Sequence, residues 1–167
     1  MKKYLIIIAF VVLATGVAPA QTSVTNPPAA WLEWNEFYKL SWHDFQGKPG
    51  DESVGDAGTF IRIKAKPFFV KKKVQYNVLV YFVKDKSWKR DPSPALLAHE
   101  QLHFDMAELY ARKIRKKIME MSNSGVNDVR QYNVEIQQLL DDSNFEHLNF
   151  EHLNFEHLNL EHLNLEL

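Results

Sequence analysis

One uninterrupted stretch constrains the fold of this chain more than any other, because residues 95–121 contain no Gly or Pro. Ser93 and Pro94 stand immediately before it, and these residue types are preferred at a helix N-cap and at the first helical position. The sequence therefore predicts one long helix starting at Ser93 and ending near Met121. One broad face of that helix carries Leu96, His99, His103, Met106 and Tyr110.

Within this helix the chain carries H-E-x-x-H, formed by His99, Glu100 and His103. Residues four apart lie one above the other on a helix, so both imidazoles can face one metal ion. Glu100 lies about 100° round the helix from His99, where it can reach a water on the metal without binding the metal. The alternative is a surface helix whose histidines face solvent. The apolar stripe argues against it, because buried imidazoles must be paired or ligated.

Zinc is the ion that this pattern favours, since neutral imidazoles leave a coordination position open for water and lower that water's pKa to about 7. Glu100 would then act as the general base in peptide-bond hydrolysis. A catalytic zinc usually takes a third protein ligand. Glu135, on the next predicted helix, is the first candidate, by analogy with two-helix zincins. His147 is the second and His43 the third.

The N-terminus predicts export. Lys2 and Lys3 precede an apolar run, and Ala18-Pro19-Ala20 is a small-x-small cleavage pattern, so residues 1–20 read as a signal peptide. Residues 21–30 read as a linker, and the mature protein is expected in the periplasm or outside the cell, without stable membrane insertion. The chain has no Cys, so a metal site must use His, Asp or Glu. A net charge of −1 gives no indication of nucleic-acid binding.

Two alternating stretches predict a small antiparallel sheet. Residues 59–66 alternate as a half-buried strand, and residues 74–83 are apolar on nearly both faces, which indicates the more central strand. Lys71, Lys72 and Lys73 lie between them and are expected at the hairpin turn, either as a binding patch or, preferably, as charges that resist edge pairing. A second helix is expected from Asn127 or Asp128 to about Leu140.

The tail, residues 144–167, repeats NFEHL-type pentapeptides to its last residue. Five residues advance about 140° around an α-helix, so this period builds no fixed apolar stripe. We interpret the tail as a low-complexity extension and assign it no function.

The segments HEQLHFDMAELYAR (residues 99–112) and SWHDFQGKP (residues 41–49) resemble a family of bacterial secreted proteins described as Zn-dependent proteases. The resemblance covers about residues 31–140. It implies a zincin-like α+β domain, here residues 31–143, with His99 and His103 as ligands and Glu100 as catalyst. Members of that family continue after the second helix into a Tyr-Asp and Thr-x-His-Gly type segment, whereas here the repeat tail begins.

The sequence thus predicts an exported zinc-dependent peptidase that acts on peptide or protein substrates. Its fold would be α+β, with a small antiparallel sheet packed on the HExxH helix and on a second helix. A sheet edge would bind the substrate in extended form. If the family's missing segment supplies the third ligand, the alternative is a non-catalytic envelope binding module that retains the HExxH helix.

Overall fold

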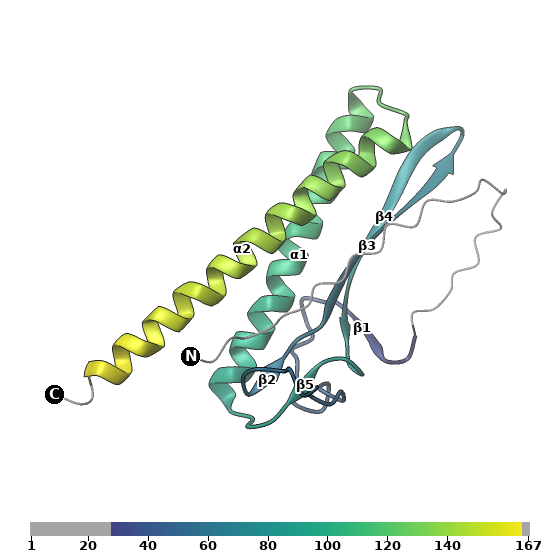
Figure 1. The fold of residues 1–167 in the computed structure, drawn as a ribbon. Helices are drawn as coiled ribbons and strands as arrows, with labels where there is room; N and C mark the ends of the chain where they lie inside the picture. Colours follow the sequence, from purple (N-terminus) through teal and green to yellow (C-terminus); the bar gives the residue numbers. More distant parts are fainter. Residues whose placement is uncertain (1–27, 165–167) are drawn as a thin grey trace.

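The protein is a two-helix hairpin lying against one face of a small antiparallel sheet (Figure 1). The computed structural model describes residues 28–164, with side chains described as far as Glu146. The helices are α1 (Pro94–Asn123) and α2 (Val129–Asn164). The strands are β1 (Trp31–Glu33), β2 (Ala57–Gly58), β3 (Ile61–Val70), β4 (Lys73–Val83) and β5 (Trp88–Lys89).

The main sheet confirms the predicted hairpin. Its strand order is β1-β4-β3, so the more apolar β4 is central and β3 forms an edge. The register pairs Ile61 with Phe82 and Val70 with Lys73, which places the turn at Lys71-Lys72. β2 and β5 form a separate two-stranded ribbon, which lies near the N-terminal end of α1 (Figure 1).

The core lies between this sheet and the two helices. The helix-facing side of β3 and β4 contributes Ile61, Ile63, Val78, Val80 and Phe82, and α1 contributes Phe104, Ala107, Ala111 and Ile114. α2 closes the other flank of α1 with Tyr132, Ile136 and Leu140. The predicted α+β architecture, a small antiparallel sheet on two helices, is therefore confirmed.

The second helix begins where expected but does not end near Leu140. α2 continues through the repeats to Asn164, and Figure 1 shows its C-terminal part projecting away from the rest of the molecule. The repeats contain no Gly or Pro, and Leu and Glu favour helix, so nothing in the local sequence ends it. Within residues 28–164, neither helix is long and apolar enough to cross a membrane.

Candidate metal centre

The N-terminal turns of α1 are fixed as the sequence predicted. Ser93 has an extended backbone, and its Oγ accepts a hydrogen bond from the Leu96 amide at 3.1 Å. Pro94 occupies the first turn. This cap sets where the helix begins, and it therefore sets the direction in which His99 and His103 project about two and three turns later.

The two histidines converge. Nε2 of His99 lies 2.9 Å from Nε2 of His103, and the rings are nearly perpendicular with centroids 4.5 Å apart. His103 is buried and His99 is half-buried. Two imidazole nitrogens on a tetrahedral zinc, each about 2.0–2.1 Å from the ion, lie about 3.3 Å apart. Small side-chain rotations would open the observed spacing to that value, so the pair fits a metal.

Glu100, which follows His99 in the sequence, is buried, with 3% of its surface exposed. Its Oε2 accepts a hydrogen bond from Oγ1 of Thr59, which is equally buried, at 2.5 Å. Thr59 lies between β2 and β3, so the segment that leads into the edge strand holds the carboxylate in place. Such a bond to an ionised oxygen is stronger than one between neutral groups.

Within the β2–β5 ribbon, a close contact between Gly58 and the side chain of Trp88 positions the neighbouring Thr59. Gly58 pairs with Trp88 in the register, and a Cβ on Gly58 would lie 2.6 Å from Nε1 of that indole. Glycine is therefore required where the indole covers the strand. No pattern in the sequence indicates the Thr59–Glu100 contact, because the two residues are 41 positions apart and lie in different parts of the fold.

Polar side chains on the next turn of α1 bind the N-terminal segment. Asp105 accepts hydrogen bonds from the Trp34 indole at 2.8 Å and from Gln101 at 2.9 Å. Gln101 in turn accepts one from the Leu40 amide at 2.8 Å. Asp105 therefore has a structural role, because it ties α1 to the segment that contains Trp34.

Glu108 also has a structural role. It is buried and bonded to both Arg112 and Arg115, at 3.0 and 2.9 Å. Arg115 also donates to the Val78 carbonyl of β4, which ties α1 to the sheet.

The SWHDFQGKP segment folds as a bonded turn against the β4–β5 connection. The Asp44 carboxylate accepts hydrogen bonds from Tyr38 and Ser41 and pairs with Lys84 at 2.8 Å. Burial alone would raise the pKa of Asp44, but the bonds from Lys84, Ser41 and Tyr38 outweigh it and lower that pKa. Gly47 bonds Ser87 through its amide at 2.7 Å, and a Cβ there would meet three backbone atoms at 2.9 Å.

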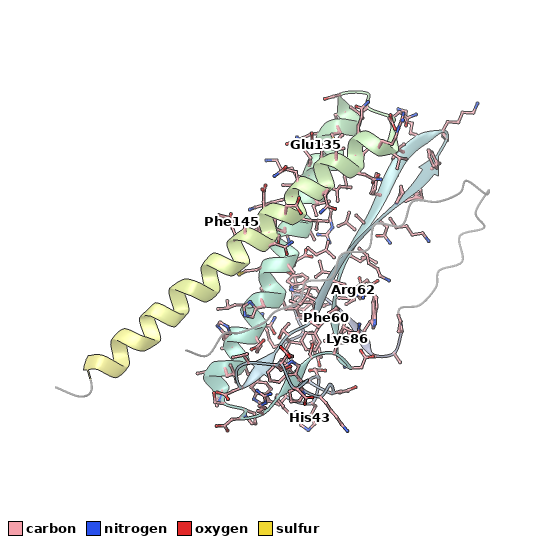
Figure 2. The ribbon with its side chains drawn as sticks, viewed as in Figure 1. His43, Phe60, Arg62, Lys86, Glu135 and Phe145 are labelled. Carbon is pink, nitrogen blue, oxygen red and sulfur yellow. The ribbon has the colours of Figure 1, made fainter. Side chains whose placement is uncertain are left out.

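The structure does not bring Glu135, the first predicted third ligand, to the histidines. Glu135 pairs with Lys117 at 2.8 Å, and Lys117 lies 18 residues, or about 27 Å of helix, beyond His99. α2 runs antiparallel to α1, so its beginning packs on the end of α1. Figure 2 shows Glu135 near the interhelical turn and His43 at the other end of the molecule.

Of the two remaining candidates, the structure describes only the side chain of His43, and it does not bring that side chain to the pair. His43 is exposed, and its backbone carbonyl accepts a hydrogen bond from the Gln46 side chain at 3.3 Å. The side chain of His147 lies outside the described residues. Among the side chains that are described, no group of three His, Asp or Glu residues is arranged to hold a metal ion.

No family model matches this chain, and no curated protein or solved structure matches it. The resemblance of residues 41–49 and 99–112 to secreted Zn-dependent proteases therefore stays a prediction.

Proposed function

We propose that this protein is an exported zinc-dependent peptidase, in which His99 and His103 bind the metal and Glu100 is the general base. One observation carries the proposal. Two imidazole Nε2 atoms lie 2.9 Å apart on the same face of α1, and Glu100, which follows His99 in the sequence, is a buried carboxylate. A metal ligand pair and an adjacent base are the parts that metal-assisted hydrolysis requires.

The donor set suits zinc, because imidazole nitrogen is among its common ligands and this chain has no thiolates. Bound there, zinc would supply Lewis-acid polarisation of a substrate carbonyl and lower the pKa of a water to about 7. A third ligand is still required. His147 is the candidate that this proposal retains, since it follows Glu146 on the part of α2 that runs back along α1.

Glu100 would take up a proton during attack on the peptide carbonyl and return it to the departing amine. Its position suits that role because the hydrogen bond from Thr59 limits its rotation. A fixed carboxylate loses less conformational freedom on reaching the reactive geometry than an exposed one does.

The open edge of β3 supports an extended peptide as the substrate. The bond from the Val83 amide to the Phe60 carbonyl means that even-numbered residues of β3 face β4. The backbone groups of Ile61, Ile63 and Ala65 therefore point outward, close to Thr59. Pro67 also points outward, where its missing N–H removes no bond to β4.

Cleavage of a peptide library by the zinc-loaded protein tests this function. Glu100→Gln should retain zinc and lose cleavage, because the amide cannot accept the proton. His43→Ala is the matched control and should cleave as the unmodified protein does. Equal cleavage by Glu100→Gln and the unmodified protein would refute the assignment of the base.

The second candidate is the non-catalytic envelope module. It is favoured by one observation, since a 2.9 Å contact between two ring nitrogens also fits a hydrogen-bonded histidine pair. In that case the pair stabilises α1 and needs no third ligand. A folded protein that cleaves no library peptide, whether or not it binds zinc, would support the module.

A further inference from the structure

The tip of the β3–β4 hairpin presents apolar and cationic side chains together. Phe68, Phe69 and Val70 are 40%, 59% and 46% exposed. Lys71, Lys72 and Lys73 follow them directly and are exposed as well. Figure 1 shows this tip at the end of the molecule where α1 turns into α2, opposite the β2–β5 ribbon.

The turn at this tip is tightly held although its residues are unfavourable for it. Lys71 and Lys72 have φ values of 48° and 64°, which a two-residue hairpin turn requires and which Asn-Gly adopts at lower cost. Asn127, from the α1–α2 connection, accepts a hydrogen bond from the Val74 amide at 2.7 Å and donates to the Lys72 carbonyl at 2.9 Å. The tip is therefore fixed to the helices and presents its side chains in one orientation.

The apolar residues of the tip lie on both faces of the hairpin. Successive strand residues alternate, so Phe69 lies on the helix-facing side with its partner Val74, while Phe68 and Val70 lie on the opposite side. Neither face buries these rings in the fold. The nearby Asp128 forms an ion pair with Arg130 at 3.1 Å. Asp128 therefore does not compensate the positive charge of the three lysines.

We propose that this hairpin tip docks into the surface of an anionic lipid bilayer. Phe68, Phe69 and Val70 would enter the interfacial region, and the lysines would bind the lipid phosphates while their stems lie along apolar surface. A soluble polyanion would engage the lysines but would leave the apolar residues in water. A bilayer is the partner that satisfies both kinds of side chain at once.

Docking at the tip sets the height of the candidate metal centre. Asn123, at the end of α1 nearest the tip, is 24 residues from His99, or about 36 Å along the helix. The site would face away from the lipid, toward material at that distance from the surface. The inference does not depend on catalysis, since a binding module would be tethered in the same way.

A fluorescent label at the tip tests the proposal in the full chain. Because the chain has no cysteine, Val70→Cys can carry a single environment-sensitive probe. Leu102→Cys, at a position 47% exposed on α1, is the matched control. Adding vesicles of phosphatidylcholine mixed with phosphatidylglycerol should shift emission to the blue at position 70 and leave it unchanged at position 102. Since the label reports locally, the apolar N-terminus does not determine the result.

A variant that removes two of the lysine charges and also favours the turn distinguishes a loss of lipid binding from a loss of folding. Lys71→Asn with Lys72→Gly should raise the lipid concentration at half-saturation by about 30-fold, at about 1 kcal/mol per lysine, while keeping the hairpin. Lys48→Gln with Lys116→Gln should change it little. An equal shift with pure phosphatidylcholine, no shift with anionic vesicles, or a shift produced by soluble polyphosphate would each overturn the proposal.

Discussion

The hydrogen bond between Thr59 and Glu100 gives the sharpest prediction about the site. Thr59→Val replaces the hydroxyl by a methyl group of similar size, so it removes the donor without leaving a large cavity. Both residues are 3% exposed, and a hydrogen bond to a charged group contributes about 1.5–3 kcal/mol. We expect the free energy of unfolding to fall by about 2 kcal/mol.

Urea denaturation in the presence of a chelator measures this loss without a contribution from metal binding. With a slope of about 2 kcal/mol per molar, the midpoint should fall by about 1 M. Thr59→Ser keeps the hydroxyl and is the matched control, with an expected loss of about 1 kcal/mol or less.

A double-mutant cycle with Glu100→Gln isolates the interaction itself. The amide accepts a weaker, neutral hydrogen bond, so Thr59→Val should cost about 1 kcal/mol less in that background. A coupling energy indistinguishable from zero, together with equal losses for the Val and Ser variants, would refute the view that Thr59 holds the carboxylate.

Three further predictions concern the scaffold and are checked by the same denaturation assay. Gly47→Ala should lower stability by about 2 kcal/mol, because the added Cβ meets backbone atoms at 2.9 Å that cannot move independently; an unchanged midpoint would contradict this. Lys71→Asn with Lys72→Gly should raise stability by about 1 kcal/mol, since it relieves two left-handed lysines; a loss would show that the turn is not of this type. The lowered pKa of Asp44 contributes stability that is fully present above its unfolded value of 3.8 and is lost as pH falls through the lowered value. Asp44→Asn should therefore cost about 2 kcal/mol at neutral pH and flatten the acid limb of the stability profile, and an unchanged acid limb would contradict the assignment.

Local patterns predicted the elements of this fold. The alternation of residues 59–66 and 74–83 identified the hairpin, and Ser93-Pro94 identified the start of α1, which agrees with the observed helix at Pro94–Asn123. Both signals act within a few residues, so no tertiary information was needed. The extension of β3 to Val70 was missed because Pro67 and the apolar run after it break the alternation.

The predicted end of α2 was wrong. Ending the helix near Leu140 relied on the lack of an apolar stripe in the repeats, but α2 extends to Asn164. A five-residue period opposes one-sided burial and yet contains no residue that breaks a helix. Helix propensity predicts that α2 continues through the repeats, whereas the lack of an apolar stripe predicts that it ends before them. The observed helix agrees with the propensity.

Only the part of the site that lies on a single element, α1, could be predicted from the sequence. Helical spacing placed His99 and His103 on one face, and their Nε2 atoms do meet. Partners from other elements depend on how the helices pack. The packing of α2 on α1 sets Glu135 against Lys117, and the packing of the sheet on α1 sets Thr59 against Glu100. Neither pairing can be read from the spacing of residues in the sequence.

Zinc stoichiometry of the purified protein tests whether His99 and His103 are the metal ligands. We expect about one tightly bound zinc per chain, abolished by His99→Ala and by His103→Ala and unchanged by the exposed His43→Ala. Zinc retained at full stoichiometry in both site variants, or lost equally in the His43 control, would contradict the assignment of His99 and His103 as the metal ligands.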